Sequence, residues 1–283
     1  MSNLSVTAVW IDAWAAVGLS FFGLLIGSFL NVVIARVPLD QSIVRPRSRC
    51  PQCSRSLAWY ENIPVLSWLY LRGRCRGCRK PISVRYPLVE LLTGFLFLAC
   101  LRRFGWNYEL VLALVLVTLL VPLTFIDLEH WLLPLALTLP GIVLGLGLSI
   151  PLGLERFRDA CLGAAVAFTA FWGLEWIGQK IFKKEALGGG DKFQLALLGS
   201  FLTVKSLLGL IFLSSFQGAL IGSSLLVLRG RAGPAPVAHS DEWVPGPTNL
   251  PFGPWLALAG LELLLFGPWL QRVLPAGLRL LAG

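Results

Sequence analysis

Charged residues are scarce in this sequence. Only 14% of the 283 residues are Asp, Glu, Lys or Arg, against about 25% in an ordinary soluble domain. Histidine occurs only twice, and neither the GxSxG motif of serine hydrolases nor the HExxH motif of zinc peptidases is present. The composition therefore argues against a soluble domain, and the missing motifs argue against serine and zinc hydrolases.

Apolar residues dominate instead, at 56% of the chain, and they gather in runs that approach the roughly 20 residues needed to span a bilayer. We therefore expect an all-α polytopic membrane protein with about eight transmembrane helices. One run is short for a span and could be tilted, extended by its neighbours or re-entrant. The runs cover about residues 9–34, 87–101, 110–126, 131–152, 160–177, 193–204 (the short run), 206–228 and 252–270.

The positive charge is concentrated in one loop. Residues 36–85 contain 11 Lys or Arg and two acids, a net charge of +9, and the rest of the chain balances to zero. A basic chain can bind nucleic acid or anionic lipid, but this placement follows the positive-inside rule and predicts a cytoplasmic loop, with membrane lipid and no nucleic acid as partner. The expected domains are a first transmembrane helix (1–34), a cytoplasmic insert (35–86) and a transmembrane core (87–283). No cleavable signal peptide is expected, because no cationic segment precedes the first apolar run.

The insert contains two Cys-x-x-Cys pairs, Cys50 with Cys53 and Cys75 with Cys78, separated by 21 residues. This spacing is typical of four-Cys zinc sites, in which two tight turns complete a tetrahedral thiolate shell. Four thiolates leave no open coordination position, so the predicted zinc is structural and stabilises a small insert. Disulfides or free thiols are the alternative, which a reducing cytosol disfavours.

Ionisable residues at membrane depth are costly and are candidates for function. Asp191 follows three glycines at a helix entrance, where a helix N-cap is an equally open interpretation. Asp127 ends the third span, and a solvated turn acid is its alternative; Glu129 beside it is equally available. Alternating sidedness places Asp127 and Asp191 at cytoplasmic ends of spans, so they could share a proton around one water and form an acid–base pair. The remaining acids of this kind are Asp12, Glu90, Glu175 and Glu262, of which Glu90 and Glu175 could reach the same layer.

Six sequence blocks resemble the prepilin peptidases, the type IV leader peptidases. These blocks are residues 27–34, 50–64 with 75–78, 85–90, 125–127, 188–191 and 251–254. The resemblance implies a GxGD-type intramembrane aspartic endopeptidase with Asp127 and Asp191 as its catalytic dyad, located in the bacterial inner membrane with its site near the cytoplasmic face. It also implies prepilin and type II pseudopilin substrates, a cut after Gly and before an apolar residue, and N-methylation of the new N-terminus with S-adenosylmethionine.

The sequence departs from this family at two positions. Leu135 follows Pro134 where the family commonly has Asp, and Phe193 stands where it usually has Lys, with Lys192 one place earlier. The role of that lysine is therefore open. No βαβ nucleotide-binding unit is evident, so no residue is assigned to S-adenosylmethionine. A non-enzymatic membrane adaptor with a zinc-stabilised docking insert remains an alternative, as does a proton-coupled carrier.

Overall fold

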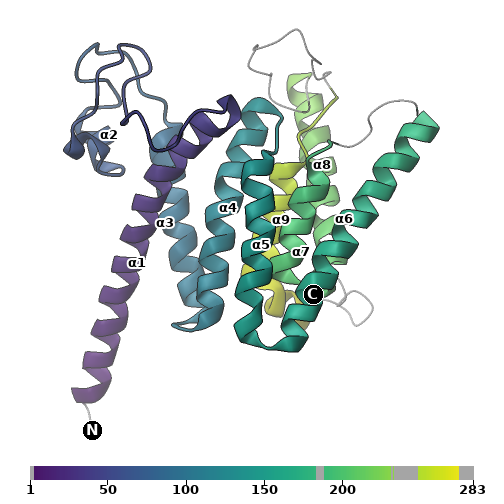
Figure 1. Cartoon of the computed structure of the whole chain (residues 1–283). Coiled ribbons are helices and arrows are strands. Elements are labelled where there is room, and N and C mark those ends of the chain that lie inside the picture. The colour runs from purple at the N-terminus through teal and green to yellow at the C-terminus, as the bar shows by residue number, and fades with distance from the viewer. Residues whose placement is uncertain (1–2, 183–187, 231, 233–247, 274–283) are drawn as a thin grey trace. The chain divides into compact units, whose positions relative to one another are not determined.

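The structure, a computed structural model, describes residues 3–182, 188–230, 232 and 248–273, and these are mostly helical (Figure 1). Among the described residues no strand is assigned, and extended pairing is limited to two isolated bridges, Arg49 with Ser56 and Arg74 with Pro81. The predicted all-α class is therefore confirmed. The chain divides into two compact units, Met1–Pro122 and Leu123–Gly283.

Each of the eight predicted apolar runs forms a helix. Six helices are long and apolar enough to cross a membrane, which supports a multi-pass membrane protein. The other two are α3 (Arg85–Phe104) and α7 (Asp191–Leu202). At 12 residues α7 is about 18 Å long, well short of a hydrocarbon core of about 30 Å. The six candidate spans are Ala13–Leu39, Tyr108–His130, Leu135–Leu152, Leu154–Lys180, Val204–Arg229 and Gly253–Arg272.

In the first unit, α1 (Asn3–Arg36) packs closely against α3. A Cβ atom on Gly27 would lie 2.7 Å from the Cα of Glu90, and one on Gly23 would lie 2.9 Å from the Cα of Gly94. The two helix backbones are therefore almost in contact, as is common where small residues line a membrane-helix interface.

The insert between α1 and α3 consists mainly of turns, with the 3₁₀ helices η1 (Val37–Leu39) and η2 (Trp59–Asn62) and the short helix α2 (Leu66–Tyr70). It contains two similar turns, which we name the first knuckle (residues 49–56) and the second knuckle (residues 74–81). The N–H of Cys50 donates to the carbonyl of Arg55 at 2.9 Å, and the N–H of Cys75 donates to that of Lys80 at 2.9 Å. The same backbone bond thus closes both knuckles.

In the second unit, α7 is enclosed by other helices. It packs against α5 (Leu135–Ser149), α6 (Leu154–Phe182) and α9 (Gly253–Val273), and Figure 1 shows it beside α5 and α6. Its residues from 194 to 201 are all buried, so even its apolar side chains face protein. The other elements of this unit are the end of α4 (Tyr108–His130), η3 (Ile150–Leu152), η4 (Val204–Ser206) and α8 (Leu207–Arg229).

Candidate functional site

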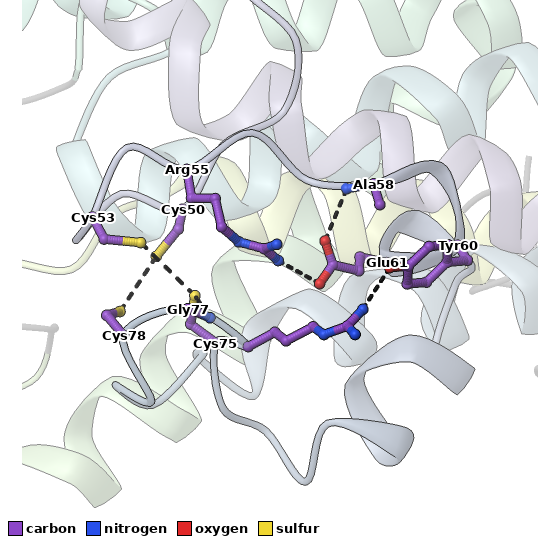
Figure 2. A network of polar contacts seen from close by, with 10 residues as sticks. Cys50, Cys53, Arg55, Ala58, Tyr60, Glu61, Cys75, Gly77 and Cys78 are labelled. Atoms are coloured by element: carbon purple, nitrogen blue, oxygen red, sulfur yellow. Dashed lines mark hydrogen bonds and ion pairs between the residues drawn. The ribbon is translucent and has the colours of Figure 1, made fainter.

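The four insert cysteines converge on one point. Their Sγ atoms all lie within 4.8 Å of one another, with Cys50 and Cys78 at 3.9 Å and Cys53 and Cys75 at 4.0 Å (Figure 2). A tetrahedral site with Zn–S bonds of about 2.3 Å has S–S edges of about 3.8 Å. The donor set therefore fits one tetrahedral metal ion, and all four cysteines are free of disulfides.

Backbone N–H groups favour the thiolate form at Cys75, whereas at Cys53 the Arg55 amide lowers the pKa but burial and the other three cysteines raise it to about 11. The amides of Cys78 and Gly77 lower the pKa of the Cys75 thiol to about 6, and the Gly77 N–H lies 3.4 Å from its Sγ. A metal ligand must be deprotonated, so the second knuckle is suited to binding a cation.

Both knuckles are attached to η2 by arginine side chains (Figure 2). From the first knuckle, Arg55 forms an ion pair with Glu61, which also accepts a hydrogen bond from the Ala58 N–H at 2.8 Å. From the second, Arg76 donates to the hydroxyl of Tyr60. Burial raises the pKa of Glu61, but the Ala58 amide and the Arg55 guanidinium more than offset this and hold it below its usual range. Glu61 therefore remains ionised and fixes η2 against the cluster.

A groove of about 590 Å³ lies beside η2 in the same unit. Arg36, the last residue of α1, donates to the carbonyls of Ser42 and Pro46 at 2.8 Å each, which holds the following loop across the helix end. We call this the Trp59 groove, after its exposed indole. Its lining combines apolar, aromatic and cationic side chains: Phe29, Val32, Arg36, Ile43, Val44, Pro46, Arg47, Ser48, Leu57, Ala58, Trp59 and Asn62.

Asp127 lies in the second unit, in the last turn of α4. Its residue is only 5% exposed, and its Oδ2 accepts a hydrogen bond from the backbone N–H of Gly253 at 3.0 Å. The alternative of a solvated turn acid is therefore wrong. Glu129, two residues later, is only half-buried.

Asp191 is the first residue of α7 and is also 5% exposed. The N-cap position belongs to Gly190, and within the described residues no side chain caps this helix, so the N-cap interpretation of Asp191 is wrong. Asp191 is close enough to Asp127 for the two carboxylates to interact electrostatically. The structure thus brings together the two aspartates that the sequence singled out.

Leu133 packs against the two glycines next to this pair of carboxylates. A Cβ atom on Gly190 would lie 2.7 Å from the Cβ of Leu133, and one on Gly253 would lie 3.1 Å from its Cδ2. Glycine at both positions therefore lets the segments that carry or contact the aspartates close around one leucine side chain.

Gln194 completes the surroundings of Asp127 and was not predicted from the sequence. It is fully buried, and its Nε2 donates to the carbonyl of Gly253 at 2.9 Å. The sequence contained one signal, because Gln194 lies three residues after Asp191 and so shares its helix face. The contact with Gly253, 59 residues away, could not be predicted from that spacing.

The other acidic candidates have separate partners. Glu175 on α6 pairs with Lys192 on α7 at 2.6 Å, and Glu90 on α3 accepts a hydrogen bond from the Val65 N–H at 2.7 Å. Glu262 accepts one from Gln217. The side chain of Asp12 lies outside the described residues. Glu175 is near Asp191, because its partner Lys192 directly follows Asp191 in the sequence, and the shifted lysine therefore has a structural partner.

Comparisons with known proteins identify the family of this chain. Residues 21–104 match the family model described as the bacterial peptidase A24 N-terminal domain, and residues 114–223 match that of the type IV leader peptidase family. Two proteins named "Prepilin leader peptidase/N-methyltransferase" are similar over most of their length. The one from Myxococcus xanthus is 56% identical over 95% of each chain, and the one from Aeromonas hydrophila is 40% identical over 92% of this chain and 93% of the other. No solved structure matches significantly. With two family models matched in chain order and relatives aligned almost end to end, the chain belongs to the type IV leader peptidase family.

Proposed function

We propose that this protein is an intramembrane aspartic endopeptidase that removes the short basic leader of type IV prepilins and type II pseudopilins, and then methylates the new N-terminal amine. The observation that carries the peptidase assignment is the pair of buried carboxylates, Asp127 and Asp191, on two separate helices. The names of the aligned relatives support both activities.

The two carboxylates suit peptide hydrolysis because close carboxylates share one proton. The ionised member takes a proton from water as the water oxygen bonds to the peptide carbonyl carbon. The protonated member gives its proton to the carbonyl oxygen. When the C–N bond breaks, the first aspartate gives the amine the proton taken from water, and a hydroxyl of the intermediate returns a proton to the second, so the pair regains its starting state.

We assign the protein to the bacterial inner membrane, with the aspartates near the cytoplasmic face. The six candidate spans and the net charge of +9 in residues 36–85 support this orientation. A prepilin would lie in the same bilayer through its own apolar helix, so enzyme and substrate meet in the membrane. The cut would follow a glycine and precede an apolar residue.

We assign zinc to the four cysteines, where it would hold the two knuckles together. Its role is structural, because four thiolates leave no position for water or substrate. Since the insert is small and consists mainly of turns, metal binding would supply much of its folding free energy.

The Trp59 groove fits the methyl donor, S-adenosylmethionine. Its volume lies within the usual range for small-molecule sites, roughly 300–1,000 Å³. The Trp59 indole, 80% exposed, offers a face on which adenine can stack, and the Arg47 guanidinium offers a partner for the methionine carboxylate. When bound, this cofactor supplies an electrophilic methyl group, and the protein's part is to orient it and exclude water.

The test is a reconstituted assay with a candidate prepilin, in which mass spectrometry reads the product N-terminus. The full chain should yield cleaved and methylated product. Asp127→Asn should yield neither, whereas a non-enzymatic adaptor would retain its biological role in this variant. Cleavage by Asp127→Asn at the wild-type rate would overturn the peptidase assignment.

The groove is tested separately by direct binding. Trp59→Ala and Arg47→Gln should weaken S-adenosylmethionine binding, measured by calorimetry, and give cleaved but unmethylated product. Tyr70→Ala is the matched control, because Tyr70 is 84% exposed in the same insert and outside the groove. Unchanged cofactor binding in both groove variants would exclude this site.

A further inference from the structure

The amide of Gln194 has one satisfied end and one unsatisfied end. Its Nε2 donates to the carbonyl of Gly253 at 2.9 Å, while its Oε1 has no hydrogen-bond partner in the described part of the chain. The residue is 0% exposed. A fully buried amide oxygen without a donor is costly, so such an atom in a native site calls for a bound group that donates to it.

The orientation of this amide is fixed by its neighbour. A carbonyl oxygen can only accept a hydrogen bond, so Nε2 must point toward the Gly253 carbonyl oxygen and Oε1 must point away from that oxygen. Both this Oε1 and Asp127 Oδ2 lie close to the position that a Cβ on Gly253 would occupy. A Cβ atom built there would lie 2.7 Å from Gln194 Oε1 and 2.6 Å from Asp127 Oδ2.

These distances bring both oxygens close to one point beside the Gly253 Cα. They can be no farther apart than the sum of the two distances, a separation that one water molecule bridges. Two acceptors cannot bond to each other, but a water can donate one proton to each. The absence of a side chain on Gly253 is what lets both oxygens approach this closely.

We propose that Gln194 Oε1 and Asp127 together hold the attacking water of the peptidase, with Gln194 as a residue that positions it. This rests on the proposed function, because it takes Asp127 as the member of the pair that accepts the water's proton. With both protons engaged, the water directs a lone pair toward the substrate carbonyl carbon.

Gln194 neither gains nor loses a proton during the reaction. As the C–O bond forms, one water proton passes to Asp127, and Asp191 gives its proton to the carbonyl oxygen. The second water proton stays on the attacking oxygen, bonded to Gln194 Oε1. When the C–N bond breaks, Asp127 gives its proton to the amine nitrogen and one hydroxyl of the intermediate returns a proton to Asp191. One peptide and one water become an acid and an amine.

The experiment compares Gln194→Leu and Gln194→Glu with the wild-type full chain, reconstituted in liposomes with a prepilin substrate. Gln194→Leu removes the acceptor at similar volume, and kcat should fall on the order of 100-fold with KM little changed. Gln217→Leu is the matched control, since Gln217 lies on α8 and bonds to Glu262. Its kcat should remain near wild type.

The Gln194→Glu variant provides a readout that a purely structural role would not give. When protonated, the new carboxyl can donate to the Gly253 carbonyl and still accept from the water, as the amide does. When ionised, it repels both that carbonyl and Asp127. The activity of this variant should therefore approach wild type at low pH and fall as pH rises through the ionisation of the new carboxyl, in addition to the loss of activity that wild type shows when the aspartates lose their shared proton.

Two results would overturn the proposal. One is a wild-type kcat in Gln194→Leu; the other, which holds even if Gln194→Leu does not fold, is a Gln194→Glu pH profile that coincides with wild type. Failure of the dyad itself would be distinct, because it would appear as cleavage by Asp127→Asn with Gln194 intact.

Discussion

The backbone N–H of Gly253 donates to Oδ2 of Asp127 at 3.0 Å, although 126 residues separate them in sequence. This bond joins the start of α9 to the last turn of α4 and holds the carboxylate with an amide that has no side chain beside it. The site therefore requires glycine at residue 253, because a side chain there would crowd the Asp127 carboxylate.

Gly253→Ala should abolish cleavage. Its methyl group would lie 2.6 Å from Asp127 Oδ2 and 2.7 Å from Gln194 Oε1, closer than ordinary contact. Gly147→Ala is the control, because a Cβ on this α5 glycine meets nothing within 4 Å. Its activity should be unchanged, and its stability should rise by up to about 1 kcal/mol. The measurements are kcat/KM and the thermal unfolding midpoint of each variant. Equal effects of Gly253→Ala and Gly147→Ala would contradict this account.

Asp127→Asn and Asp191→Asn should each lower the cleavage rate by roughly 10³-fold or more while the protein still inserts. An amide cannot take or give the shared proton. Asp159→Asn on α6 is the matched control, since Asp159 pairs with Arg158 and Lys205 away from the aspartates. Residual activity in Asp127→Asn would direct attention to Glu129.

Purified protein should contain about one zinc per chain, the content of a four-thiolate site. Cys50→Ser or Cys75→Ser should lower the metal content and the unfolding midpoint, because an incomplete shell binds zinc weakly. Cys161→Ser should keep both, as Cys161 lies on α6 outside the cluster. The zinc content is measured by elemental analysis of protein purified without chelators. A wild-type protein without metal would refute the assignment.

Lys192→Met should destabilise the protein by about 2 kcal/mol, because it leaves Glu175 unpaired in a mostly buried position. The two side chains are 18% and 17% exposed and 2.6 Å apart. Adding Glu175→Gln to this variant should restore part of the loss, since the uncompensated charge is removed. A double-mutant cycle on the unfolding midpoint checks this, and strictly additive effects would mean that the ion pair contributes nothing.

The sequence was sufficient for the parts of the molecule that depend on local spacing. Apolar run lengths predicted the helices, including a short one that became α7, and the two Cys-x-x-Cys pairs predicted a cluster that the Sγ distances support. Asp127 and Asp191 were also singled out, the first because it ends an apolar run and the second because it follows three glycines. Their catalytic role stays a prediction.

Contacts between distant segments could not be predicted. The carbonyl that Gln194 meets belongs to Gly253, and no periodicity in the chain links these two residues. The ion pair of Lys192 with Glu175 was not predicted, because the two residues lie on different helices. Such pairings depend on how helices pack, which hydropathy does not encode.

The backbone closure of the two knuckles bears on how the chain is oriented during synthesis. The equivalent bonds use main-chain atoms, and the residues between the cysteines already differ, Pro51 and Gln52 in one knuckle and Arg76 and Gly77 in the other. Side chains of the insert that neither bind nor brace the cysteine cluster can therefore vary to meet a second requirement. In the orientation proposed above, arginines and lysines can accumulate there as a signal that retains this loop on the cytoplasmic side, at little cost to metal binding. One segment can therefore evolve as a topology signal and as a metal site almost independently.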